Sequence, residues 1–399
     1  MRFLSEIDVN EIKDKRVVLR VDYNVPMKNG EILDTNKIDS SFKTIDYLVN
    51  LKCKIIILSH FGRVKSEEDL KSNSLEPVFN YIKGLNKYNI KFSHVIMGKP
   101  LDEMAENLGP GEIVLVENTR YMDIHGKLES SCDTQLAMYW ANLGSFYVDD
   151  AFGSMHRNHA SVTGIPKYVE GAIGFLAENE IKNLSKLLNV TERPFVVIMG
   201  GAKLDDKIEL IYSLAEKADH VLLGGGIANT FLTAAGIETG SSLVSRDALF
   251  NAKSIMDEFP DIIILPKDVI VSTTYNKDKV EIKNVDDLVM DDIIGDIGPK
   301  AIENYSRLIN SAKIIFINGT VGMYEQKEFA NGTREILDIV SKSNALKIVG
   351  GGDAASSVAN LGFKDKMNFI STGGGATLSY IANGSLPGID AIINNKKNN

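Results

Sequence analysis

Cysteine is nearly absent from this chain, and its scarcity excludes two classes of protein. Only Cys53 and Cys132 occur among 399 residues, which is too few for a disulfide framework and gives no metal-ligand spacing. An excess of positive charge is also lacking, because 53 acidic residues outnumber 44 basic ones and the net charge is −9. Nucleic-acid-binding proteins are usually basic overall, so we expect no nucleic-acid partner. A local basic cleft for an anionic ligand is compatible with this balance.

Long hydrophobic runs are lacking as well. No apolar run reaches the roughly 20 residues of a transmembrane helix, and residues 1–5 lead into charged sequence rather than into a signal peptide. We therefore expect a cytoplasmic protein with no membrane partner. The 44% hydrophobic and 24% charged residues are typical of globular proteins, and 399 residues are too many for one ordinary core. Two domains are expected.

Short apolar runs rich in Val and Ile recur along the chain, and each is followed by a segment of helical length. Runs without polar alternation are typical of parallel strands that are covered on both faces. Their alternation with helices predicts an α/β fold with doubly wound parallel sheets, divided by a helix that begins near residue 175. The expected strands are residues 16–25, 54–59, 113–117, 146–148, 195–199, 220–223, 262–265, 313–317, 346–349 and 368–371.

Ionisable and polar side chains follow four expected strands in the first half of the chain. The richest segment is residues 149–161, which holds an arginine and two histidines. Because the carboxyl ends of parallel strands share one edge of a sheet, these side chains can converge. Alone, each would more often be solvated, salt-bridged or a turn cap. Together they favour a site for an anionic small molecule, with arginines for phosphate or carboxylate. The candidates are Asp22, Asn24, His60, Arg63, Arg120 and Arg157.

Glycine clusters are concentrated in the second half of the chain. Neither a Walker A loop nor a dinucleotide fingerprint in the right context is present. Four glycine turns follow expected strands instead, at residues 200–201, 224–226, 350–352 and 373–375. Glycines let the backbone approach a phosphate, and a helix N-terminus supplies free N–H groups. One such cluster is more often a tight turn, but four favour a nucleotide site.

Charged residues near these turns are candidates for phosphate, ribose and metal binding. Lys203 and Lys207 could both reach a transferring phosphate, or could be solvated lysines of a helix. Asp353 could bind Mg²⁺ or cap a helix. Glu325 is placed to meet a ribose hydroxyl, and the alternative is an ordinary exposed glutamate.

In combination, these motifs resemble the phosphoglycerate kinase family over essentially the full chain, in the family's order from Val21-Asp22 to Leu386-Pro387-Gly388. The resemblance implies two Rossmann-like domains joined by a hinge helix. Residues 1–174, with the C-terminal tail 380–399, would bind 3-phosphoglycerate, and residues 175–379 would bind the nucleotide. It further implies a monomer and the reversible glycolytic reaction of 1,3-bisphosphoglycerate and ADP to 3-phosphoglycerate and ATP, with Mg²⁺, by in-line transfer after domain closure.

The resemblance also implies roles for individual residues. It assigns the glycerate to Asp22, Asn24, Lys37, His60, Arg63, Arg120 and Arg157. It assigns the nucleotide to Lys203, Lys207, Gly225, Asn318, Glu325, Gly351, Gly352, Asp353 and Ala354, with Asp353 as the metal ligand. It assigns phosphoryl transfer to Lys37, Lys203, Gly352 and Gly375.

Two of these positions depart from the family pattern. Lys37 stands where the family has an arginine, which keeps the charge but loses the planar fork. Ala354 replaces a hydroxyl residue beside Asp353. One alternative is therefore a weakly active or inactive paralogue that binds the same ligands in a regulatory or scaffolding role. Another is a different nucleotide-dependent α/β enzyme, such as a dehydrogenase, which the missing dinucleotide fingerprint disfavours.

Overall fold

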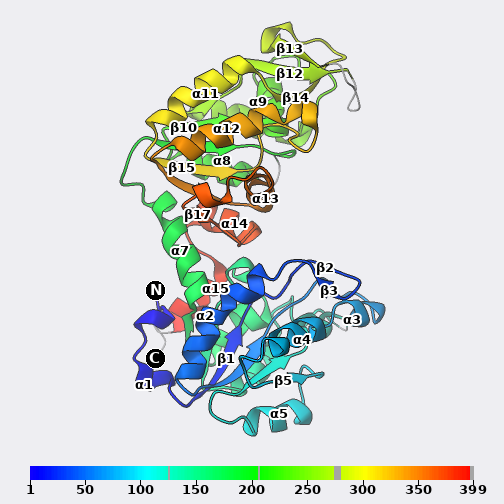
Figure 1. Ribbon diagram of the computed structural model, residues 1–399, viewed down its shortest axis with the longest axis vertical. Helices are drawn as coiled ribbons and strands as arrows, with labels where there is room; N and C mark the ends of the chain where they lie inside the picture. Colours follow the sequence, from blue (N-terminus) through cyan, green and yellow to red (C-terminus); the bar gives the residue numbers. More distant parts are fainter. Residues whose placement is uncertain (125, 205–206, 274–279, 396–399) are drawn as a thin grey trace. The chain divides into compact units, whose positions relative to one another are not determined.

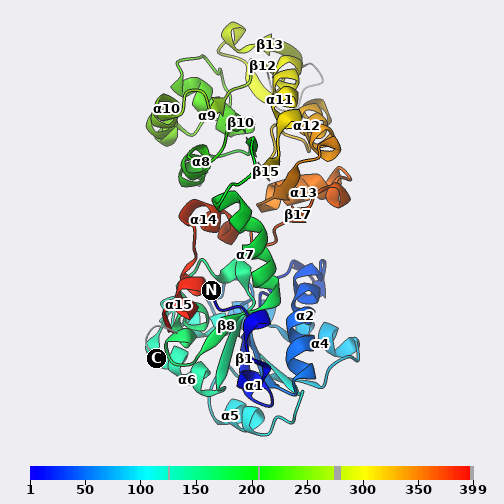
Figure 2. The same ribbon diagram turned by 90° about the vertical axis from the view of Figure 1, so that its left-hand side faces the viewer.

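The computed structural model describes residues 1–124, 126–204, 207–273 and 280–395 (Figures 1 and 2). The chain divides into two compact units, Met1–Lys182 with Ser385–Asn399, and Asn183–Gly384. The first boundary lies within helix α7 (Phe175–Leu188), whereas the sequence placed it at the start of this helix. The second boundary lies a few residues after the predicted one.

The first unit is built on a six-stranded parallel sheet. Its strands are β1 (Arg16–Arg20), β4 (Lys54–Leu58), β5 (Ile90–Ser93), β6 (Ile113–Val116), β7 (Phe146–Asp149) and β8 (Gly171–Ile173). They are arranged in the order β5-β6-β4-β1-β7-β8. Residues 17–19 of β1 pair with 55–57 of β4 on one side and with 146–148 of β7 on the other, and all are buried. This is the pattern of a parallel strand covered on both faces.

The helices of both units begin and end as follows. The first unit contains α1 (Val9–Ile12), α2 (Asn36–Asn50), α3 (Glu68–Ser72), α4 (Glu76–Gly84), α5 (Lys99–Glu106), α6 (Thr134–Asn142) and α15 (Pro387–Asn395). The second unit contains α8 (Ile208–Ala215), α9 (Gly225–Ala234), α10 (Leu249–Glu258), α11 (Pro299–Ser311), α12 (Asn331–Lys342), α13 (Gly352–Asn360) and α14 (Gly375–Asn383). None of the described helices is long and apolar enough to cross a bilayer.

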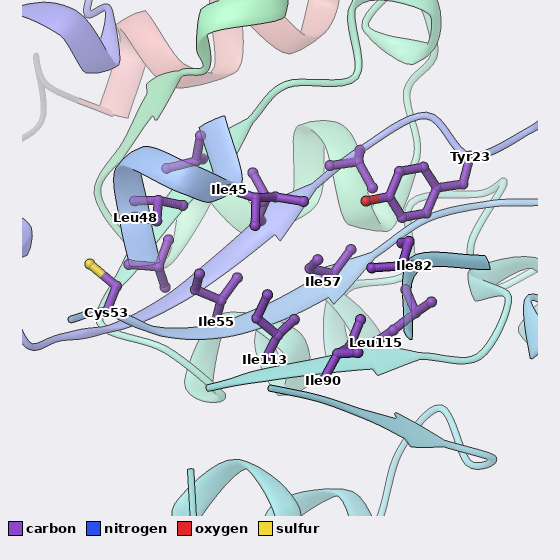
Figure 3. Packing of buried hydrophobic residues seen from close by; sticks show 14 of the residues in the cluster. Tyr23, Ile45, Leu48, Cys53, Ile55, Ile57, Ile82, Ile90, Ile113 and Leu115 are labelled. Carbon is purple, nitrogen blue, oxygen red and sulfur yellow. The ribbon is translucent and has the colours of Figure 1, made fainter. Parts of the chain in front are cut away.

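Helix α2 covers one face of the first sheet. Its residues Ile45 and Leu48 belong to the same buried cluster as Ile55 and Ile57 of β4 (Figure 3). Alternate residues of a strand point to the same face, so these two isoleucines meet the helix together. The C-terminal helix α15 also belongs to this unit, because the N–H of Gly388 donates to the carbonyl of residue 155 at 2.9 Å.

The second unit contains another six-stranded parallel sheet. Its strands are β9 (Phe195–Met199), β10 (His220–Leu223), β11 (Ile263–Ile264), β15 (Ile314–Asn318), β16 (Leu346–Val349) and β17 (Phe369–Ile370). They are arranged in the order β11-β10-β9-β15-β16-β17. All the expected strands are present, some of them shortened, and the predicted α/β fold with two parallel sheets is confirmed.

Two small antiparallel sheets were not predicted. One pairs β2 (Met27–Lys28) with β3 (Glu31–Ile32), and the expected strand over 16–25 ends at Arg20 before it. The other contains β12 (Asp268–Ser272), β13 (Glu281–Asn284) and β14 (Ile293–Ile297) in the order β13-β12-β14. β13 is mostly exposed, and β14 contains a glycine and an aspartate, which disfavour strands. Neither therefore carries the apolar signature that marked the parallel strands.

Asp296 gives a testable pH dependence of stability. Its carboxylate accepts the N–H groups of Ile297 at 2.9 Å and of Gly332 at 2.6 Å, and burial raises its pKa from 3.8 to about 7. At pH values between 3.8 and about 7, the Asp296 side chain is protonated in the folded protein and ionised in the unfolded chain. The stabilising contribution is therefore complete below pH 3.8 and is lost as the pH rises through about 7.

We expect the free energy of unfolding of the wild type, relative to an Asp296→Asn variant, to fall by about 1.4 kcal/mol per pH unit between roughly pH 5 and 7. Denaturant unfolding at a series of pH values measures this difference. Curves for the two proteins that stay parallel over the range would contradict the raised pKa.

Candidate functional site

Four loops of the first unit carry the residues that were predicted to bind an anion. The loops follow β1, β4, β6 and β7, which are neighbours in the order β6-β4-β1-β7. Because these strands run parallel, the loops lie at one edge of the sheet. They carry Asp22 and Asn24 after β1, His60 and Arg63 after β4, Arg120 after β6, and Arg157 after β7.

Lys37 forms an ion pair with Asp22. Lys37 lies in the first turn of α2, and its Nζ lies 2.9 Å from Asp22 Oδ2. Burial alone would raise the pKa of Asp22, but the Lys37 ammonium, together with His60 and Arg20, outweighs burial and the pKa is lowered from 3.8. Asp22 is therefore a carboxylate at neutral pH, and the pair offsets the repulsion between a lysine and a helix N-terminus.

His60 is a neutral hydrogen-bond donor at the same edge. Burial lowers its pKa to about 3, and although Asp22 opposes this shift, the nearby cations including Arg20 add to it. Arg20 Nη2 lies 3.2 Å from His60 Nδ1. A guanidinium can only donate, so Nδ1 is the acceptor and the ring proton is on Nε2. Arg20 was missed by the sequence analysis, and its only signal is an arginine that ends an apolar, buried strand.

Arg63 and Arg120 line a cavity of about 530 Å³. Arg120 is only 9% exposed, and burial lowers its pKa, with Arg157 and Arg63 acting in the same direction against Asp123. Within the described part of the chain, Arg120 Nε has no hydrogen-bond partner, and the nearest oxygen of Asp123 is 3.8 Å away. Three guanidinium groups in mutual repulsion favour an anionic ligand with several oxygens.

The ionisable loop after β7 has a structural role in addition to the predicted one. Asp150 is buried, and its Oδ1 accepts the N–H groups of Leu176 at 2.8 Å and Ala177 at 3.1 Å. Burial raises the pKa of Asp150 to about 6. This carboxylate caps the start of α7, so only part of the loop is available to a ligand.

Three of the four predicted glycine turns join a strand of the second unit to a helix. They lead from β10 to α9, from β16 to α13 and from β17 to α14. Gly225, Gly351 and Gly374 have φ values of +61°, +93° and +54°, which glycine adopts at little cost. The turns therefore present the free N–H groups of three helix starts at one edge of the sheet, as phosphate binding requires.

A cavity of about 280 Å³ lies beside the turn before α9 and the start of α13. Gly225, Glu325 and Asp353 line it, together with the apolar side chains of Leu243 and Met323. An apolar wall opposite glycine turns and carboxylates suits a nucleotide, because its base has apolar faces and its phosphates need N–H donors.

Some predicted nucleotide residues contact the protein itself. Asn318 Nδ2 donates to the carbonyl of Gly350 at 2.7 Å and so holds the turn before α13. Lys207 Nζ donates to the carbonyl of Gly200 at 2.8 Å. The side chain of Ala354 is fully buried in the core of the unit, so its methyl group has no access to a ligand. Asn318 and Lys207 therefore support the glycine turns through these bonds, and Ala354 contributes to the packing of the core.

Lys203, Gly352 and Gly375 are exposed, as is Asp353. No group of three or more His, Cys, Asp or Glu side chains suited to a metal converges among the residues that the structure describes. A single exposed carboxylate is nevertheless the donor set that fits Mg²⁺, which keeps several waters and takes its other ligands from substrate phosphates. Asp353, in the first turn of α13, is placed to serve in this way.

A sequence model of the family described as phosphoglycerate kinase matches residues 7–384. The chain belongs to the phosphoglycerate kinase family. The phosphoglycerate kinase of Macrococcus caseolyticus (strain JCSC5402) is 43% identical over 384 residues, which are 96% of this chain and 97% of that protein. The phosphoglycerate kinase of Lactiplantibacillus plantarum is also 43% identical, over 396 residues and 98% of each chain.

Solved structures agree with this assignment. The phosphoglycerate kinase of Coxiella burnetii matches with a TM-score of 0.88 and 35% identity over 98% of each chain. That of Pyrococcus horikoshii OT3 matches with a TM-score of 0.81 and 29% identity over the full length of both. The predicted family is confirmed, and the chain is a kinase of glycolysis.

Gly351 offers a direct test of the glycine turns. A Cβ at this position would lie 2.5 Å from Asn318 Nδ2, so a Gly351→Ala change forces the turn before α13 to move. We expect it to raise KM for ATP by about tenfold or more, because the helix N-terminus is displaced. Steady-state kinetics with varied ATP measures this effect.

Gly362→Ala is the matched control. Gly362 also has a positive φ, +81°, but a Cβ there would meet nothing within 4 Å. Both variants strain the backbone and should lose about 1 to 3 kcal/mol of stability. An equal KM for ATP in the two variants would contradict a nucleotide site at this turn.

Proposed function

We propose that this kinase transfers a phosphoryl group reversibly between 1,3-bisphosphoglycerate and ADP, giving 3-phosphoglycerate and ATP. One observation carries the proposal. Each unit has a candidate site at the carboxyl edge of its parallel sheet, with clustered arginines in one and glycine turns at helix starts in the other. The first suits a small polyanion, and the second suits a nucleotide.

A cytoplasmic monomer is the proposed form of the enzyme. One chain supplies both ligand sites, so catalysis requires no second copy. Both cysteines are free thiols, as is usual in a reducing compartment.

The first unit binds the glycerate in this proposal. Arg63, Arg120 and Arg157 neutralise its phosphate, and the Nε2–H of His60 donates to one of its oxygens. Asp22, which is held as a carboxylate by its ion pair, accepts the hydroxyl of the glycerate. Asn24 assists it from the same loop.

The second unit binds the nucleotide. The glycine turns at Gly225 and Gly351 place backbone N–H groups against its phosphates, and Lys203 and Lys207 add positive charge. Glu325 binds the ribose from the wall of the cavity. Asn318 acts through the turn that it holds.

Mg²⁺ is proposed as the metal, with Asp353 as its protein ligand. When bound, the ion neutralises charge on the phosphate oxygens of the nucleotide. The carboxylate stands at the start of α13, from which Asp353 would hold the ion.

The mechanism rests on alignment and charge neutralisation. The acceptor oxygen is ionised on ADP and on the carboxylate of 3-phosphoglycerate, so no general base is needed. Lys37 and Lys203 stabilise the charge that spreads over the transferring group, and the N–H groups at Gly352 and Gly375 receive its oxygens.

Replacement of Lys37 tests this mechanism. We expect Lys37→Ala to lower kcat at least about 100-fold, because it removes the cation proposed to act on the transferring group. Lys43→Ala is the matched control, since Lys43 lies on the same helix but packs over the ring of Phe175 at 5.0 Å. It should keep kcat within about twofold. A similar kcat for both variants would remove Lys37 from the mechanism.

Lys37→Arg separates the enzyme from the binding-only paralogue. We expect the wild type to turn over, because the Lys37 ammonium is already held in place by Asp22. The arginine variant should therefore change kcat only modestly. An inactive wild type with recovered activity in Lys37→Arg would favour the paralogue.

The two proposed ligand sites lie in different units, so transfer requires the units to close around both ligands. ADP and 3-phosphoglycerate together cannot react, because neither carries a transferable group. We expect small-angle scattering to show a smaller radius of gyration with both than with either alone. No compaction with both bound would contradict closure.

A further inference from the structure

The side chain of Asn118 is fully buried and uses its entire hydrogen-bonding capacity. Its Oδ1 accepts the N–H groups of Phe61 and Arg120, both at 3.0 Å. Its Nδ2 donates to the carbonyl of Phe61 at 2.6 Å and to the carbonyl of Asn73 at 2.8 Å. An amide has two acceptor sites and two N–H donors, so none is left for a ligand.

The four bonds of Asn118 join three segments that are distant in the sequence. Phe61 lies between His60 and Arg63 in the loop after β4. Arg120 belongs to the loop after β6, as does Asn118 itself. The third segment, which joins α3 to α4, contains Asn73. The Asn118 side chain therefore fixes the positions of two loops relative to each other, and both loops carry candidate ligand-binding residues.

Neighbouring contacts extend this connection to Arg63. Asn73 Nδ2 donates to the carbonyl of Arg63 at 3.0 Å. Asn24 Oδ1 accepts the N–H of Gly62 at 3.0 Å, which joins the loop after β1 to the same assembly. The Glu117 carboxylate accepts the backbone N–H of Asn118 at 2.8 Å and so fixes the backbone that carries the Asn118 side chain.

We propose that Asn118 is a positioning residue for the glycerate site. It sets the separation of His60, Arg63 and Arg120 through the backbones of their loops, without touching the ligand. The guanidinium groups of Arg63 and Arg120 repel each other, and a fixed backbone is needed to keep their spacing matched to one phosphate. This inference rests on the proposed role of these residues in glycerate binding.

The test compares KM for the two substrates in an Asn118→Ala variant of the full chain. We expect KM for 3-phosphoglycerate to rise about tenfold to 100-fold, since small displacements of positioning groups have effects of this size. KM for ATP should stay within about twofold, because the nucleotide site lies in the other unit. A KM for 3-phosphoglycerate that stays at the wild-type value, or an equal rise for both substrates, would overturn the inference.

A control for lost stability is available in the same unit. Glu112 directly precedes β6, so it lies at the opposite edge of the sheet from the four loops, where its carboxylate accepts the N–H of Gly109 at 3.0 Å and the Nδ2–H of Asn89 at 2.6 Å. Glu112→Ala should lower the unfolding temperature and leave both KM values unchanged. If it raised KM for 3-phosphoglycerate as Asn118→Ala does, the effect would be one of general stability and the inference would be overturned.

Two more variants keep the test decisive. Asn73→Ala removes the bond to the Arg63 carbonyl from a half-buried position, so it should raise KM for 3-phosphoglycerate less than Asn118→Ala. If Asn118→Ala does not fold, an unchanged KM for 3-phosphoglycerate in Asn73→Ala overturns the inference.

Arg63→Ala tests the proposed site itself. If Arg63→Ala raises KM for 3-phosphoglycerate and Asn118→Ala does not, only the positioning role fails. If Arg63→Ala leaves this KM unchanged, the proposed glycerate site itself is wrong.

Discussion

The parallel pairing of strands is the constraint on which both candidate sites depend. Parallel strands end at one edge of a sheet, so the loops that follow them are neighbours whatever their distance in the sequence. In the first unit the order β6-β4-β1-β7 brings together loops that are separated by tens of residues. In the second unit the order β10-β9-β15-β16-β17 does the same for the glycine turns. The side chains of each loop are set by its local sequence, but the strand order of the sheet brings the loops together into a site.

Placing many cations at one edge has an electrostatic cost, and the first unit offsets it in several ways. His60 is kept neutral by burial, so it contributes a hydrogen bond without adding charge. The Lys37 charge is balanced by Asp22 at 2.9 Å. The remaining repulsion among the arginines is left for an anionic ligand to relieve. The site is thus organised before the ligand binds, and backbone bonds such as those of Asn118 keep it so.

The sequence predicts the strands and the loop chemistry well, because both leave local patterns. Buried strands are runs of Val and Ile, and ligand loops carry Arg, His or Gly at their ends. It does not predict Arg20 or Asn118, whose partners lie 40 and 57 residues away and are brought near only by the fold. It also misses β12 to β14, since β13 is mostly exposed and β14 contains a glycine and an aspartate, and it misses the short parallel strands β5 and β8. The buried side chain of Ala354 shows the limit of assigning a role from a motif alone.

The measurement that tests the central claim most directly is a coupled steady-state assay of the wild-type enzyme with ATP, 3-phosphoglycerate and Mg²⁺. The account predicts ADP formation that saturates with each substrate and depends on both being present. ADP formation without 3-phosphoglycerate, or none at all from a folded protein, would contradict it.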